Sequence, residues 1–363
     1  MNKIMIIGAG KTGRGFIARL AGEDGKQVAF VDRDAQLIEK LKEAGRFEIS
    51  YFNRDRENSV VEGFQACTWE DADFSRAELI FVSVGGQNLE DVGKRLHDAL
   101  QGEKERYVIT CENASNPAKK LSALIDNPHV HVSEATVFCT TIEDGGLNIA
   151  SENYPYLQCD ADLLCGYQPP IAAVRPVGDF GNFLTRKLFT YNAASCVIAY
   201  LGAYKGYTDY AKAANDPEIL GLLDRNYEET NRAMCLEFGY EEADQREFSL
   251  LSRAKFTSTA IRDTVERNAR DVARKMAAGE RIIGILQLIR KHGGEGKVLQ
   301  LTAAAALLYP WDEKWLTLRK EKTDDQILSE LCGLEAGELK NAILALRDEL
   351  MKKERTLEEL LEG

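Results

Sequence analysis

The chain has 363 residues, a length that corresponds to about two domains, each with room for a sizeable hydrophobic core. Hydrophobic residues make up 44% of it and charged residues 29%, a balance typical of a soluble globular protein rather than a disordered or fibrous one. The net charge of −12 argues against nucleic acid and anionic membranes as partners, but not against a phosphorylated small molecule, which meets only its own pocket.

The N-terminal part of the chain begins with a strand, a glycine turn, a helix and a second strand. The apolar runs at 3–7 and 27–31 predict strands that are buried on both faces, and the glycine-rich segment lies between them. Asp34 is the expected N-cap of the next helix, which should stop at Gly45.

The alternation of strands and helices then continues towards residue 125. A polar-faced antiparallel pair is expected within it, and each later strand precedes an amphipathic helix, which predicts a parallel, doubly wound sheet. The expected elements are the pair at 47–52 and 59–64, strands at 79–82 and 107–110, and helices at 89–100 and 117–125.

From about Asp179 the strand patterns give way to helical periodicity, and three prolines between 169 and 176 mark the join. We therefore predict an α/β protein in which a Rossmann-type sheet domain, residues 1–178, precedes an all-helical substrate and catalytic domain, residues 179–363, with a cleft between them. The helical segments are expected at 183–204, 218–237, 258–274, 282–291 and 325–360.

The glycine turn carries the pattern GxGxxG, which is a weak signal alone but here follows a strand, opens a helix and precedes an acidic residue. Gly8 permits the turn, Gly10 lets a pyrophosphate approach the backbone, and Gly13 lets the helix pack on the strand. The helix N-terminus offers N–H groups to the phosphates. The expected cofactor-binding residues are Gly8, Gly10, Lys11, Thr12, Gly13, Asp32, Arg33, Val84 and Glu112.

Asp32 decides which dinucleotide is expected. Its carboxylate would accept hydrogen bonds from the adenosine ribose hydroxyls and would repel a 2′-phosphate, so NAD is favoured over NADP. The neighbouring Arg33 leaves NADP open, because a guanidinium there could hold a phosphate.

Metal and targeting signals are missing from the sequence. The eight cysteines include no CxxC pair, and with only four histidines they give no metal-site spacing, so we expect reduced thiols in a cytoplasmic protein. The apolar run at 4–7 is too short for a signal peptide, and the run at 301–309 is too short to span a bilayer.

No histidine lies in a setting that suggests a catalytic base. The stretch 186–195 offers a lysine instead, Lys187. A lysine can act as a base only if desolvation and neighbouring positive charge lower its pKa from ~10.4 towards ~7–8.

Four motifs in chain order resemble those of the polyol-specific long-chain dehydrogenases: GAGKTGRGF (8–16), CEN (111–113), KLFTYN (187–192) and AYLG (199–202). The segment 263–281 is similar to the second-domain signature of that family. The resemblance implies an NAD-dependent, zinc-independent oxidation of a polyol. It implies Lys187 as general base, Asn192 and Asn113 as donors to the substrate oxygen, and Arg267 and Lys275 as contacts to the far end of the substrate.

Two departures from the family pattern concern the substrate. Ser195 stands where the family has a histidine, and Phe138-Cys139 stand where it has an Asp-Arg pair. A serine hydroxyl still hydrogen-bonds, so Ser195 is expected to contact the substrate, but it carries no charge near neutral pH. The base and the amide donors are retained, which suggests hydride transfer on a different substrate.

Helical geometry gives a first expectation for the site. On an ideal α-helix Lys187 and Ser195 lie about 80° apart and Asn192 lies about 60° beyond Ser195, so all three could border one groove. Three arginines, Arg267, Arg270 and Arg274, would fall within about 60° on the helix expected at 258–274, where they are either a solvated face or an anion site.

The leading interpretation is an NAD-dependent oxidoreductase that interconverts a secondary alcohol and a ketone on a sugar-derived small molecule. That molecule is a polyol phosphate, a sugar acid or a related compound, and the protein is a monomer or a homodimer. Two alternatives stay open: a sensor that binds NAD and a metabolite without turnover, and an isomerase or lyase that uses tightly held NAD transiently.

Overall fold

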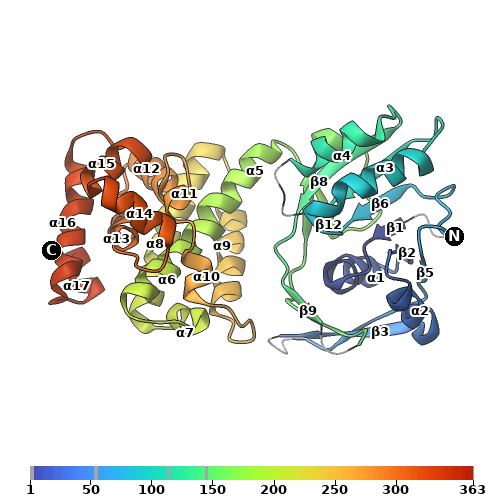
Figure 1. Ribbon diagram of the computed structural model, residues 1–363, viewed down its shortest axis with the longest axis horizontal. Coiled ribbons are helices and arrows are strands. Elements are labelled where there is room, and N and C mark those ends of the chain that lie inside the picture. Colours follow the sequence, from blue (N-terminus) through green and yellow to red (C-terminus); the bar gives the residue numbers. More distant parts are fainter. Residues whose placement is uncertain (1–3, 53–55, 113, 115, 144–145, 363) are drawn as a thin grey trace. The chain divides into compact units, whose positions relative to one another are not determined.

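The computed structural model describes residues 4–52, 56–112, 114, 116–143 and 146–362 (Figure 1). The chain divides into two compact units, Met1–Phe183 and Leu184–Gly363, and the division falls inside helix α5 (Phe180–Lys187). Within the described ranges, no helix is both long and apolar enough to cross a membrane.

The first unit is built on a mainly parallel sheet. In the described residues its strand order is β12-β11-β8-β7-β6-β1-β2-β5, and every neighbouring pair is parallel except β11 with β8. The strands are β1 (Ile4–Ile7), β2 (Val28–Val31), β5 (Gln65–Cys67), β6 (Leu79–Val82), β7 (Arg106–Thr110), β8 (Val130–Thr136), β11 (Leu157–Asp160) and β12 (Val174–Val177). The predicted Rossmann-type fold class is confirmed.

Helices cover this sheet because their apolar faces match its buried strands. Helices α3 and α4 pack together over one face, and their leucines share a core with Met5, Ile80 and Val108 (Figure 1). The helical elements of the unit are η1 (Gly13–Ala18), α1 (Arg19–Glu23), α2 (Ala35–Ala44), η2 (Gly86–Asn88), α3 (Leu89–Ala99), α4 (Pro117–Ile125) and η3 (Asp162–Leu164).

Local signals explain where helix α2 begins and ends. The Asp34 carboxylate accepts hydrogen bonds from the backbone N–H groups of Gln36 (3.0 Å) and Leu37 (3.1 Å), which makes it the predicted N-cap. Gly45 ends the helix in the left-handed conformation, with φ of 62°.

A second, smaller sheet lies in the same unit. It has the order β4-β3-β10-β9 and consists of β3 (Arg46–Tyr51), β4 (Ser59–Glu62), β9 (Thr141–Glu143) and β10 (Ile149–Ser151). The antiparallel pairing of β3 and β4 was predicted, but the parallel pairing of β3 with β10 was not. Pairing between distant segments leaves no local sequence signal.

The second unit is helical throughout the residues that the structure describes. Helix α6 is its central element and packs against α7, α8, α10 and α13. The helices are η4 (Leu188–Asn192), α6 (Ala193–Tyr204), α7 (Tyr210–Ala214), α8 (Pro217–Phe238), α9 (Glu242–Thr257), α10 (Val265–Ala269), α11 (Val272–Met276), α12 (Ile283–Lys291), α13 (Lys297–Leu307), α14 (Glu313–Glu321), α15 (Asp324–Gln326), η5 (Ile327–Leu331), α16 (Glu338–Lys352) and α17 (Leu357–Glu362).

Two helical expectations were wrong. The segment 258–274 is not one helix, because residues 258–264 are irregular and α10 ends before Arg270, whose ψ of 156° breaks the helical path to α11. The segment 325–360 is likewise divided among α15, η5, α16 and α17. Helical periodicity in the sequence does not register such breaks, because residues on both sides of a break bury apolar side chains in the same core.

Candidate functional site

The glycine turn after β1 is closely packed at two of its three glycines. A Cβ on Gly8, whose φ is +99°, would lie 2.0 Å from the Ser83 carbonyl oxygen, and one on Gly13 would lie 2.0 Å from the Gly8 carbonyl oxygen. A Cβ on Gly10 would meet no atom of the described residues within 4 Å. The protein's own packing therefore leaves open space over Gly10, which fits a ligand that approaches the backbone there.

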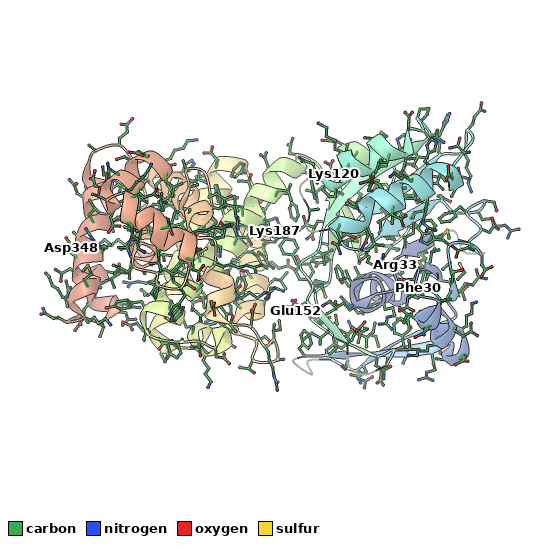
Figure 2. All side chains as sticks on the ribbon, viewed as in Figure 1. Phe30, Arg33, Lys120, Glu152, Lys187 and Asp348 are labelled. Carbon is green, nitrogen blue, oxygen red and sulfur yellow. The ribbon has the colours of Figure 1, made fainter. Side chains whose placement is uncertain are left out.

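The carboxylate of Asp32 is fixed beside this turn. Its Oδ2 accepts a hydrogen bond from the backbone N–H of Ala9 (2.7 Å), and its Oδ1 accepts one from the N–H of Asp34 (2.9 Å). Arg33, labelled in Figure 2, is an exposed residue two positions beyond the end of β2. Lys11 and Thr12 complete the turn, with Thr12 in helical conformation before η1. The predicted cofactor residues of this segment thus lie together.

Glu112 joins two neighbouring loops at the carboxyl ends of β6 and β7. Its Oε1 accepts hydrogen bonds from the backbone N–H groups of Val84 (2.6 Å) and Gly85 (2.9 Å), and burial raises its pKa above the usual range. Val84 and Glu112, both predicted as cofactor residues, are therefore in direct contact. Asn113, predicted as a catalytic donor, lies outside the described residues.

Lys187, labelled in Figure 2, is the last residue of α5, and the hydrogen-bonding pattern of the helix changes after it. From Leu188 to Asn192 the chain forms a π-helix, closed by a hydrogen bond from the Ala193 N–H to the Leu188 carbonyl. A turn with i→i+5 hydrogen bonds is wider than an α-helical turn, so residues five apart are offset by a smaller angle than the about 140° of an α-helix. The turn therefore aligns Asn192 with Lys187 more closely than the sequence-based estimate, which assumed an ideal α-helix.

Burial and a second lysine change the acidity of Lys187. Desolvation, followed by repulsion from the Lys255 ammonium, lowers the pKa of Lys187 to about 8. Lys255 lies in the last turn of α9, which packs against η4 through the rings of Phe248 and Phe256 on Tyr191, at centroid distances of 5.0 and 6.2 Å. A lysine that acts as a base needs a pKa lowered in this way.

A cavity of about 490 Å³ lies in the same unit and is rich in cations. Asn192 and Ser195 contribute to its wall from the segment that follows Lys187, which is not itself in the wall. The wall contains one acidic residue, Asp271, and five positively charged ones: Arg267, Arg270, Arg274, Lys275 and Arg281.

The cations of this cavity differ in burial. Lys275 is 6% exposed and its pKa is lowered, first by burial and further by the nearby Arg281 and Arg274. Its Nζ donates to the Asn268 carbonyl. Arg267 is an exposed residue that pairs with Asp263 at 2.7 Å. Arg267, Arg270 and Arg274 are all exposed, as a solvated face requires, and all three also border the cavity, as an anion site requires.

Ser195 has a partner that the sequence analysis missed. The hydroxyl of Tyr210 donates to the Ser195 Oγ at 3.1 Å, which leaves the Ser195 O–H as a donor towards the cavity. Tyr210 opens α7, and backbone hydrogen bonds from Tyr210 to Asp263 and from Val265 to Thr208 tie it to the segment before α10. The contact between Ser195 and Tyr210 joins two separate helices, α6 and α7, so no local motif could have revealed it.

The histidines that were not expected to act as a base, and Phe138, contact other side chains. His129 and His131 both contact the Glu105 carboxylate at 2.6 Å, and His292 contacts Glu237 at 2.8 Å. Phe138, which occupies the place of the family's Asp-Arg pair, stacks on Tyr154 at 5.2 Å. Within the described ranges no group of three histidines, cysteines or carboxylates is placed to hold a metal.

The sequence pattern of the Mannitol dehydrogenase C-terminal domain matches residues 179–360, half of the chain. The chain belongs to the mannitol dehydrogenase family. Residues 4–159 also match the pattern of Ketopantoate reductase PanE/ApbA. Curated relatives include the mannitol-1-phosphate 5-dehydrogenases of Brevibacillus brevis, 26% identical (91% of this chain, 93% of the relative), and of Paenarthrobacter aurescens, 28% identical (85% and 86%).

Two solved structures of polyol dehydrogenases share the fold of this family member. D-sorbitol dehydrogenase in substrate-free form has a TM-score of 0.76 at 14% identity and covers 97% of this chain and 93% of its own. Pseudomonas fluorescens mannitol 2-dehydrogenase, in a ternary complex with NAD and D-mannitol, has a TM-score of 0.59 at 14% identity, with 99% and 94% covered. The predictions of the family and of an oxidoreductase with a Rossmann-type fold are confirmed, and NAD is the cofactor named for the mannitol 2-dehydrogenase structure.

Proposed function

We propose that this chain is an NAD-dependent dehydrogenase that interconverts a secondary alcohol and a ketone on an anionic polyol derivative, either a polyol phosphate or a sugar acid. The observation that carries the proposal is one helical segment, 187–195. Its first residue has a pKa lowered to about 8, and two later residues line a cavity walled by five cations.

The dinucleotide would be held by the turn of the first unit. The backbone over Gly10 and the helix N-terminus at Lys11 and Thr12 suit a pyrophosphate, and Asp32 suits the ribose hydroxyls. When bound, NAD supplies the hydride acceptor of the oxidation and, when reduced, the hydride donor of the reverse reaction.

Lys187 would move the proton. As a free amine its Nζ accepts the proton of the substrate hydroxyl during oxidation, and as an ammonium it returns a proton to the oxygen during reduction. A pKa of about 8 keeps both forms accessible near neutral pH. The amide of Asn192, and that of Asn113, would donate to the same oxygen as its charge changes.

The cationic cavity would bind the anionic end of the substrate. Its volume of about 490 Å³ is in the range of small-molecule sites, and Lys275 and Arg281 are the most buried of its five cations. Ser195, held by Tyr210, would donate to a substrate hydroxyl between that end and the reacting carbon.

The proposal is tested with NAD and a panel of polyols, polyol phosphates and sugar acids, by following the absorbance of the reduced nicotinamide. An anionic substrate should turn over, and Lys187→Met should lower kcat by at least about 10³-fold while NAD binds with unchanged affinity. Near-normal turnover in this variant contradicts the role of Lys187. NAD and substrate binding without turnover across the panel would favour the sensor alternative, which rests on Ser195 and Phe138 at positions where the family has other residues.

A further inference from the structure

A buried arginine precedes Lys187 and ties the end of α5 to α9. The guanidinium of Arg186, a residue only 5% exposed, lies between the rings of Tyr240 and Phe248, 4.3 Å from each centroid. Its Nε donates to the Gln245 Oε1 at 2.6 Å, and its Nη2 pairs with Asp244 at 2.8 Å. Stacking, one charge-assisted hydrogen bond and an ion pair therefore fix this side chain in one orientation.

Gln245 reaches the other side of the π-helical turn. Its Nε2 donates to the Thr190 Oγ1 at 3.1 Å and to the Asn231 Oδ1 at 2.9 Å. Asn231 is oriented in turn, because its Nδ2 donates to the Ser249 Oγ at 2.9 Å. Gln245 is 0% exposed, so both of its donors and its oxygen are used inside the protein.

The two residues that Gln245 joins, Arg186 and Thr190, stand on either side of Lys187 in the sequence. Between them the backbone changes from i→i+4 to i→i+5 hydrogen bonding, an arrangement that is rare in helices and that needs support from the surrounding structure. The amide of Gln245 therefore bonds one side chain on each flank of this change, Arg186 before it and Thr190 within it.

We propose that Gln245 is a positioning residue for the reaction: it holds the turn that keeps Lys187 and Asn192 aligned at the same substrate oxygen. The inference rests on the proposed function, because it assigns a purpose to the alignment of those two groups. A misplacement of reacting groups by about 1 Å costs on the order of 10²-fold in rate, which sets the scale of the effect.

The experiment compares Gln245→Met with a matched control, Gln300→Met. Gln300 is also a buried glutamine of the same unit, and its Nε2 donates to the Glu295 carbonyl at 2.7 Å, in α13 rather than beside η4. Gln245→Met should lower kcat by about 10- to 100-fold with the KM for NAD unchanged, while Gln300→Met keeps kcat. Gln245→Glu, which retains an acceptor for Arg186, should recover part of the loss.

A second readout does not depend on turnover. Acetic anhydride acetylates the free amine of a lysine, so the pH dependence of Lys187 acetylation, followed by mass spectrometry, reports the pKa of Lys187. Gln245→Met should move the midpoint by at least about half a pH unit, because the turn repacks around the amine, and Gln300→Met should leave it in place.

The outcomes separate the two proposals. Equal kcat and equal acetylation midpoints in the Gln245 and Gln300 variants overturn the positioning role, even when Lys187→Met is inactive. A shifted midpoint together with an active Lys187→Met enzyme contradicts the base instead. If Gln245→Met does not fold, Thr190→Val takes its place, with Thr190→Ser as its conservative partner. Equal kcat and equal acetylation midpoints in Thr190→Val and Thr190→Ser overturn the proposal.

Discussion

The charge of Lys255 should set part of the pH dependence of this enzyme. Burial is the larger cause of the lowered pKa of Lys187 and Lys255 the smaller one, out of a total change from 10.5 to about 8. Removing the smaller cause should therefore raise the pKa of Lys187 by less than half of that change, and we expect a rise of about 0.5–1 unit in Lys255→Gln.

The sign of the effect follows from which form of Lys187 works. Oxidation needs the free amine, so kcat/KM for oxidation rises with pH and reaches half its maximum near the pKa. A higher pKa moves this limb to higher pH. Below pH 7, Lys255→Gln should lose about 3- to 10-fold in kcat/KM, because each pH unit below the pKa costs about tenfold in free amine. Well above the pKa the variant and the parent should agree.

The assay is the full pH profile of kcat/KM for oxidation at constant ionic strength. Lys255→Arg keeps the charge and should retain the parent profile, and Lys212→Gln, which removes an exposed lysine of α7, controls for net charge. If Lys255→Gln lowers kcat/KM equally at every pH, the electrostatic reasoning is refuted and the residue acts through packing alone.

Two further predictions concern the cavity and the stability of the helical unit. Arg281→Gln should raise the KM for a phosphorylated or carboxylated substrate about 10- to 100-fold and leave the KM for a neutral polyol unchanged. Arg290→Gln on α12 is the control. Equal changes in KM for both kinds of substrate would exclude an anion contact. A lysine whose pKa is lowered on folding destabilises the folded state while it is charged. Lys187→Met should therefore stabilise the protein at pH 7 by at most about 3 kcal/mol, and by less if the amine is partly solvated. This gain should shrink as the pH rises from 8 to 10.5, and denaturant unfolding at pH 7 and pH 10 that gives the same difference would contradict it.

The elements that could be predicted from the sequence are those that neighbouring residues in the chain define. Helix α4 runs from Pro117 to Ile125, as the helical pattern indicated, because a proline at its first position and buried Leu121 define it locally. The glycine turn and Asp32 were equally readable, because their spacing is itself the signal. Lys187 was found through a resemblance and a rule on pKa values rather than through helical geometry.

Features that depend on distant contacts could not be predicted. The π-helical turn was invisible, because the expected angles assume a regular α-helix. The bonds of Tyr210 to Ser195 and of Gln245 to Thr190 join separate helices, so neither partner carries a sign of the other in its own segment. The cationic cavity was anticipated in its residues, but they surround it from both sides of a break between α10 and α11 rather than from one helix face.

The parallel pairing of β3 with β10 has a consequence for how the first unit acquires its structure. Ile49 is paired with Ile149, so 100 positions of chain separate the two partners, and the connection must close before the smaller sheet exists. Such remote pairing raises contact order and slows folding, because the entropy of closing a long loop is lost before the contacts reward it. During synthesis, the early strands of this sheet must therefore wait, unpaired on one edge, until the ribosome has delivered residues 149–151.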